Sequence, residues 1–176
     1  RITGPWGSLT GGRTLTLFSR GALELTYLYG YRYGLGFPGG ISTAGQSTAG
    51  SVGFGVLASG FGAGFAYATP VMGGFQLTVG AYDPNNIVTV RALERTRWPR
   101  EEFEATYQLK FGASGLIKLF GNGAWQRLYD QVGYSRTADV WGLGYGFRFE
   151  GGPFRIGFAG HYGKGIGVDY AMQPHL

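Results

Sequence analysis

FEATYQLKF, residues 103–111, alternates bulky apolar residues with polar ones along its whole length. The apolar positions are Phe103, Ala105, Tyr107, Leu109 and Phe111, and the positions between them are Glu104, Thr106, Gln108 and Lys110. An extended strand points successive side chains to opposite faces, so a period of two predicts a strand with two different faces. What the apolar face contacts decides the function of the chain.

The same alternation recurs along the chain and predicts an all-β protein. The expected strands are 10–18, 60–69, 74–82, 103–111, 116–127, 140–149 and 154–163, with 52–58 as an eighth or as the beginning of the second. Short turn signals stand at 70–74, 112–115 and 150–153, and longer polar segments stand at 83–102 and 129–139. Short turns at one end and long loops at the other are typical of bacterial outer-membrane barrels.

A helix is the competing interpretation of WPREEFEATYQLKF, residues 98–111. Pro99 stands early, Glu101 and Glu102 fall in a first turn, and Phe103 and Tyr107 are spaced by four. The GASG turn and the alternating LIKLFGNGAW that follow favour a strand instead.

The composition excludes several classes of protein and site. Aromatic residues make up 16% of the chain, which excludes a disordered tail, and its 35 Gly lack the regular spacing of collagen. There is no Cys, hence no disulfide and no thiolate zinc site, and no phosphate-binding, dinucleotide, EF-hand or HExxH motif occurs. We therefore expect no cofactor. The net charge of +5 is dispersed, without the basic patch that nucleic acid requires.

Residues 33–82 contain no Asp, Glu, Lys, Arg or His, but 14 Gly and many Ser and Thr interrupt them, so a transmembrane helix explains them poorly. The apolar face continues from segment to segment, and no predicted helix covers it. In water it would form a patch larger than monomers tolerate. We expect it to face lipid, with the polar face inward on water; a soluble β-sandwich, with the apolar faces packed together, is the alternative.

The stretch GRTLTLFSRGALELTYLYGYRYGLGFP, residues 12–38, resembles the trimeric general porins of Gram-negative outer membranes, in which a strand ending in Gly-Arg precedes a segment that folds back into the barrel. The pieces YATPVMGGFQLTVGAYDP, LIKLFGNGAWQ and GFAGHYGKGIGVDYAM are similar to successive porin strands and turns. The resemblance implies a transmembrane antiparallel β-barrel of 16 strands, water-filled, through which small hydrophilic solutes and ions diffuse passively. It also implies a homotrimer, in contact with outer-membrane lipid and lipopolysaccharide.

The chain departs from this family in offering seven or eight strands and in ending with AMQPHL instead of an aromatic strand. We therefore expect residues 1–176 to be a single β-barrel domain or a fragment of one, from the middle of a longer porin. The alternative is a complete eight-stranded barrel with a structural or lipid-hydrolysing role. Side chains fill the interior of such small barrels, and the Gly-rich inner face would fill it poorly.

Selectivity in a diffusion pore comes from its diameter and from the charges at its narrowest point. The candidate constriction loop is 19–51, and the expected constriction residues are Arg13, Glu24, Tyr27, Tyr29, Tyr31, Arg32 and Tyr33. Loop packing is the alternative role for the tyrosines, and an exposed strand end is the alternative for Arg13. Inward parity predicts a pore wall of Glu104, Gln108, Lys110, Lys118, Asn122, Gln126, Arg148, Arg155 and His161.

Two further segments carry charge or chemistry. The mixed run 91–102 is expected to be a solvated loop, with lipopolysaccharide or a neighbouring subunit as the alternative contact. A lipid hydrolase would need Ser, His and an acidic partner, and the only histidines are His161 and His175. No Ser stands at a suitable depth beside His161, so we expect no enzyme. The charge of +5 predicts a weak anion preference.

Overall fold

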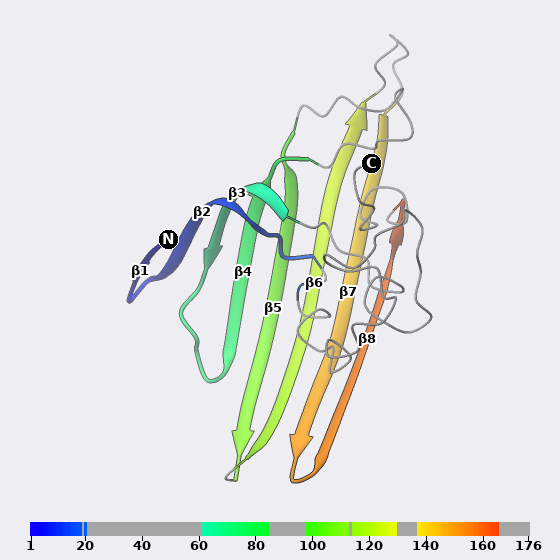
Figure 1. Cartoon of the computed structure of the whole chain (residues 1–176). Helices are drawn as coiled ribbons and strands as arrows, with labels where there is room; N and C mark the ends of the chain where they lie inside the picture. Colours follow the sequence, from blue (N-terminus) through cyan, green and yellow to red (C-terminus); the bar gives the residue numbers. More distant parts are fainter. Residues whose placement is uncertain (19, 21–60, 85–97, 113, 130–136, 166–176) are drawn as a thin grey trace, which may run out of the picture.

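The computed structural model describes residues 1–18, 20, 61–84, 98–112, 114–129 and 137–165. They form one antiparallel sheet whose eight strands are hydrogen-bonded in chain order (Figure 1). The strands are β1 (Ile2–Gly4), β2 (Gly7–Leu15), β3 (Phe61–Ala68), β4 (Phe75–Tyr82), β5 (Arg100–Phe111), β6 (Gly115–Tyr129), β7 (Thr137–Gly151) and β8 (Phe154–Lys164). Every connection joins neighbouring strands, as in a barrel wall built by up-and-down hairpins.

The alternation predicts most of these strands correctly, and residues 100–111 form a strand rather than the alternative helix. Several boundaries differ from expectation, and β5 and β7 each begin three residues before the predicted strand. The first predicted strand begins earlier and ends at Leu15, because Thr16–Phe18 leaves the sheet. The short strand β1 has only three residues, too few to show a period. The expected strand at 52–58 lies outside the described residues.

Glycines make the hairpin turns at one end of the sheet. Gly73 and Gly74 have φ values of 58° and 89°, and Met72 and Phe75 exchange backbone hydrogen bonds of 2.8 and 2.9 Å across them. Two successive positive φ angles are what a two-residue type I′ turn requires. The β5–β6 and β7–β8 turns lie at this same end in Figure 1, which we call the short-turn end. At the opposite end of the sheet β4 and β6 end and β5 and β7 begin, and we call it the long-connection end.

The strand register fixes two faces that run across the whole sheet. Val79, Phe103, Gly123, Leu143 and Tyr162 are successive partners on β4 to β8 and share one face, the outer face. The successive partners Thr78, Glu104, Asn122, Gly144 and His161 share the other, the inner face. The predicted parity of β5 is therefore the observed one.

The large apolar side chains of the outer face are exposed, whereas a sheet of a soluble protein buries such side chains. Phe65, for example, is 68% exposed and Tyr162 is 70% exposed. The buried hydrophobic cluster of Phe18, Ala124, Leu128 and Val140 lies instead on the inner side. No second layer packs on the outer face within the described part of the chain, unlike the sandwich alternative.

The sheet is open, because β1 and β8 are its two edges and are not paired with each other in the described residues. A closed eight-stranded barrel would require that pairing. Among the residues that the structure describes, no helix is long and apolar enough to cross a membrane.

Candidate functional site

The outer face carries an uncharged band that crosses β5 to β8, eight to ten residue steps along each strand. The outward residues are uncharged from Phe103 to Phe111 on β5, from Gly115 to Trp125 on β6, from Trp141 to Gly151 on β7 and from Phe154 to Tyr162 on β8. The span from 141 to 151 is ten residue steps, or about 34 Å of strand at about 3.4 Å a step. At a tilt of about 40° it covers about 26 Å, close to the apolar band of about 25 Å in outer-membrane barrels.

Aromatic and charged residues mark the upper edge of this band, toward the long-connection end. Trp125 and Trp141 face each other across β6 and β7, and the next outward pair is Arg127 with Asp139. Arg127 donates from Nε and Nη2 to the two Asp139 oxygens at 2.7 and 3.1 Å, and its guanidinium lies 5.3 Å from the Trp125 ring centre. Tryptophans followed by charges are the pattern of a membrane–water interface.

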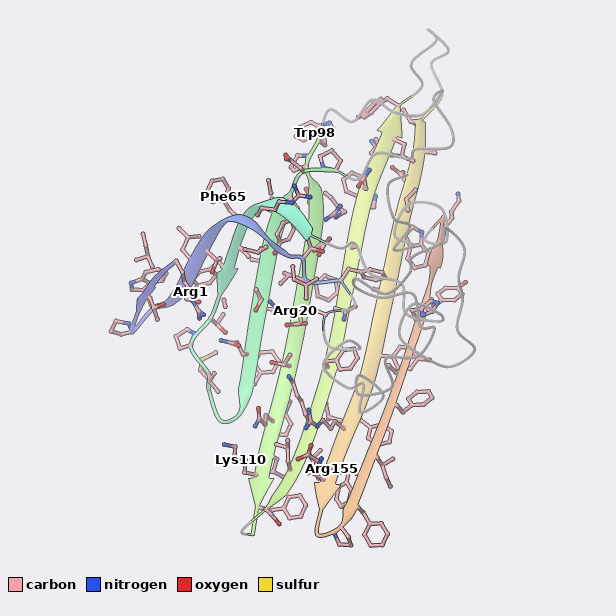
Figure 2. All side chains as sticks on the ribbon, viewed as in Figure 1. Arg1, Arg20, Phe65, Trp98, Lys110 and Arg155 are labelled. Atoms are coloured by element: carbon pink, nitrogen blue, oxygen red, sulfur yellow. The ribbon has the colours of Figure 1, made fainter. Side chains whose placement is uncertain are left out.

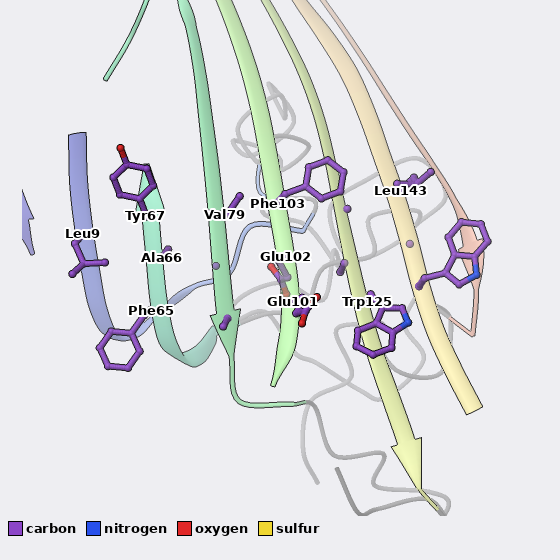
Figure 3. Close-up of a pocket in the computed structure, with 16 residues that line it drawn as sticks. Leu9, Phe65, Ala66, Tyr67, Val79, Glu101, Glu102, Phe103, Trp125 and Leu143 are labelled. Atoms are coloured by element: carbon purple, nitrogen blue, oxygen red, sulfur yellow. The ribbon is translucent and has the colours of Figure 1, made fainter. Parts of the chain in front are cut away.

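An open groove of about 740 Å³ crosses the outer face below this edge (Figure 3). Gly123, Phe103 and Leu143 are among the residues that line it, and the side chains of Phe103 and Leu143 pack over Gly123. Its lining is mostly apolar, and Glu101 and Glu102 are the two charged residues among those that line it. The groove therefore lies mainly on the apolar side of the sheet.

The inner face holds a charged cluster that fixes the chain after β2 against β5. Glu102 accepts hydrogen bonds from the backbone N–H groups of Leu17 and Phe18 at 2.6 and 2.8 Å through Oε2. Its Oε1 accepts from Arg100 Nε at 2.6 Å. Both charged side chains are 0% exposed, so the two backbone donors and the guanidinium together offset the cost of burying the carboxylate.

Arg20 extends this cluster by one more ion pair. Its Nη2 contacts Glu104 Oε1, and its Nε donates to Oε2 at 3.3 Å. Beside it, Phe18 packs into the apolar cluster of Ala124, Leu128 and Val140. We call Arg20, Arg100, Glu102 and Glu104 the tether cluster, because they hold Thr16–Phe18 and Arg20 over the inner face.

A second charged group occupies the short-turn end of the inner face. Lys118 faces Arg148 across β6 and β7, and Glu150 faces Arg155 across β7 and β8. Arg148 Nε donates to Glu150 Oε1 at 2.6 Å. Figure 2 shows Lys110 and Arg155 low on the sheet, away from Arg20. We call Lys110, Lys118, Arg148, Glu150 and Arg155 the basic cluster.

The structure places all the predicted pore-wall residues on the inner face. These are Glu104, Gln108, Lys110, Lys118, Asn122, Gln126, Arg148, Arg155 and His161. They divide by burial, since Glu104, Asn122 and Gln126 are buried whereas Gln108, Lys110, Arg155 and His161 are exposed. Asn122 lies against Gly144, where an added side chain would collide with its amide. Their roles in transport stay predictions.

Of the residues predicted to form the constriction, only Arg13 lies in the described part of the chain. Glu24, Tyr27, Tyr29, Tyr31, Arg32 and Tyr33 lie outside the described residues, as does the loop 19–51 apart from Arg20. Arg13 differs from expectation. Its register with Ala63 puts it on the outer face with Leu9 and Phe65, not on the inner face. Gly11 and Gly12 precede it, and because neither has a side chain, the sequence does not show which residues of this strand face outward.

Four members of the two clusters were not among the predicted site residues, namely Arg20, Arg100, Glu102 and Glu150. Residues 100–102 were expected to end a solvated loop, but they begin β5, and two of them are buried. Extending the alternation of 103–111 by two residues toward the N-terminus gives Glu102 the inward parity of Glu104. The extended alternation is therefore the sequence signal that indicates an inner-face position for Glu102.

Comparison with known proteins agrees with this geometry. No protein-family model and no curated protein matches the chain significantly. Among solved structures, the chain is similar to the outer membrane channel DcaP of Acinetobacter baumannii, with a TM-score of 0.63 and 15% sequence identity. The match covers 93% of this chain and 40% of that channel, so the chain spans less than half of its length. The likeness shows that these eight strands have the fold of an outer-membrane channel wall.

Proposed function

We propose that this chain forms part of the wall of a passive, water-filled channel in the outer membrane of a Gram-negative bacterium. The observation that supports this most strongly is the pair of faces on β5 to β8. Consecutive residues alternate between an uncharged band about 26 Å high and a hydrophilic inner face. Only an environment with lipid on one side and water on the other suits both faces at once.

Transport in this proposal needs no chemical step. Small hydrophilic solutes and ions diffuse past the inner face, and charged side chains on the wall bias which of them enter. The tether cluster narrows the water-filled space beside the inner face, because it holds Thr16–Phe18 over that face instead of in the sheet. The Glu102 carboxylate has a positioning role here, since it orders backbone and not solute.

The finer parts of the proposal follow the resemblance to general porins. A barrel of 16 strands would close the free edges of β1 and β8 with strands outside this sheet. Three copies would assemble through part of the apolar outer face, and lipid and lipopolysaccharide would cover the rest. The mass of the detergent-solubilised assembly, measured by light scattering with the detergent subtracted, tests the trimer; a monomeric mass contradicts it.

Conductance in planar lipid bilayers tests the central proposal. We expect discrete steps whose size grows in proportion to salt concentration, as in a water-filled pore, and their loss after heat denaturation of the same sample. Vesicles that contain the protein should also swell in isotonic solutions of small sugars. Protein that stays soluble without detergent and gives neither steps nor swelling contradicts the proposal.

A further inference from the structure

Charges of opposite sign stand on the two flanks of the outer face of β2 to β5, toward the long-connection end. Arg13 on β2 is exposed on one flank, and Asp83, just after β4, and Glu101 on β5 are exposed on the other. Within the described part of the chain none of these three side chains forms an ion pair. Arg127 and Asp139, farther along the same face, pair with each other.

Arg13 and Glu101 lie at nearly the same depth, although the register separates them. By register Glu101 is level with Gly11, two residues below Arg13 on β2. The short-turn end steps in the same direction, because β5 runs past the level of the β3–β4 hairpin from Tyr107 to Phe111 before its own turn. Strand tilt in a barrel produces such a stagger, and here it offsets the difference in register.

The surface between the two flanks is apolar and uneven. Phe65 on β3 is 68% exposed, and its ring lies over Gly11, 2.8 Å from the place that a Cβ would take there. The open groove runs from Phe65 across β4 and β5, where Ala81 and Phe103 line it (Figure 3). A projecting ring beside a groove allows this surface to fit a second copy of itself.

Symmetry brings the opposite flanks of this surface together. Copies of one membrane protein insert in the same direction, so an axis that relates them runs along the membrane normal. Rotation about that axis, in a dimer or in a trimer, places the β2 flank of one copy against the β5 flank of the next. Arg13 then meets the carboxylates of Asp83 and Glu101 of the neighbouring copy, and like charges stay apart.

We propose that the outer face of β2 to β5 is the contact surface between copies of this chain, with Arg13 of one copy paired with Glu101 of the next. The inference rests on the proposed function, because it needs the protein in a membrane. It explains why an arginine that we expected in the constriction lies exposed on the apolar side of the sheet. Opposite charges at the contact select its register and orientation.

Disulfide formation in lipid vesicles tests the contact directly, because the chain has no cysteine of its own. Within one copy Arg13 and Glu101 are three strand spacings apart, about 14 Å, too far for a disulfide. Arg13→Cys with Glu101→Cys in one chain should therefore give covalently linked copies on a denaturing gel after mild oxidation. The matched control, Glu101→Cys with Lys164→Cys, has the same spacing on the outer face but reaches β8, and it should stay unlinked.

Charge exchange gives the second measurement. Arg13→Glu should raise the dissociation constant of the assembly in mild detergent at low salt about tenfold, because it replaces attraction by repulsion. Adding Glu101→Arg to the same chain should recover most of that loss, since every copy then carries both exchanged charges. Lys164→Glu, which makes the same change on β8, should leave the dissociation constant unchanged.

The outcomes separate the contact from the channel. Failure of the Arg13 and Glu101 cysteines to link, or equal linking in the control, overturns the contact. Loss without recovery in the double exchange also overturns it, and is the result expected if anionic lipid occupies Arg13. A monomer that conducts overturns the contact and leaves the channel function standing. Linked and charge-rescued assemblies without conductance support the contact and contradict the channel function alone.

Discussion

Phe158 and Ala159 are consecutive residues at the middle of β8, and they lie on opposite faces of the sheet. Phe158 is 54% exposed on the outer face, where its ring contacts those of Tyr145 and Phe147. Ala159 is exposed on the inner face opposite Gly146. Because both residues have the same depth, the pair isolates the effect of the face from the effect of position.

Arginine at these two positions should have very different costs. At the middle of the apolar band, Phe158→Arg places a guanidinium in hydrocarbon and should destabilise the folded protein by about 2–4 kcal/mol relative to Phe158→Ala. That corresponds to roughly a 30- to 900-fold change in the folding equilibrium constant. Ala159→Arg places the same group in water and should change stability by less than about 1 kcal/mol.

Reversible denaturant unfolding in phospholipid vesicles, followed by tryptophan fluorescence, measures both costs. Phe158→Ala accounts for the lost ring contacts, so the difference between it and Phe158→Arg reports the charge alone. Equal costs at the two positions, or a larger cost for Ala159→Arg, would refute the assignment of lipid to the outer face.

Three smaller perturbations test the individual contacts. Glu102→Gln should destabilise the protein by about 3–5 kcal/mol, because it leaves the buried Arg100 guanidinium without its carboxylate; a cost below about 1 kcal/mol in vesicle unfolding contradicts the tether. Asp139→Asn should cost at most about 1 kcal/mol in the same assay, since the side chains of Arg127 and Asp139 are 41% and 44% exposed; a cost like that of Glu102→Gln would show that this pair is buried in the membrane. Gly74→Ala should destabilise by about 1–3 kcal/mol, because Gly74 has a φ of 89° and an added methyl would meet the Gln108 backbone; unchanged stability would contradict the type I′ turn.

The two-faced character of the strands could be predicted from the sequence wherever large side chains mark every second residue. In β7, Trp141, Leu143, Tyr145 and Phe147 mark the outer face without ambiguity. Strand β2 is GSLTGGRTL and has only Leu9 and Leu15 as large apolar residues. With so few markers the face of Arg13 could not be read from its neighbours, and the family resemblance assigned it to the wrong side.

The contacts within the tether cluster could not be predicted for a different reason. Glu102 bonds to Leu17, which is 85 residues away in the sequence. No local pattern reports a contact of that range, and a mixed run such as RTRWPREE reads as solvated because charged residues seldom lie buried without a partner. The basic cluster could be predicted from the sequence only in part. Alternation predicts that its four cations share a face, but only the register reveals that Lys118 and Arg148 are direct partners.

The chain contains no cysteine, so single cysteines can be introduced at each position from 154 to 162 and spin-labelled without background. The most direct measurement is the accessibility of these labels, in lipid vesicles, to oxygen, which concentrates in hydrocarbon, and to a water-soluble nickel complex. We predict a period of two, with oxygen favoured at Ile156, Phe158 and Tyr162 and the nickel complex favoured at Arg155, Ala159 and His161. Equal accessibility of both reagents at neighbouring positions, or the opposite phase, would contradict a sheet with lipid on one face and water on the other.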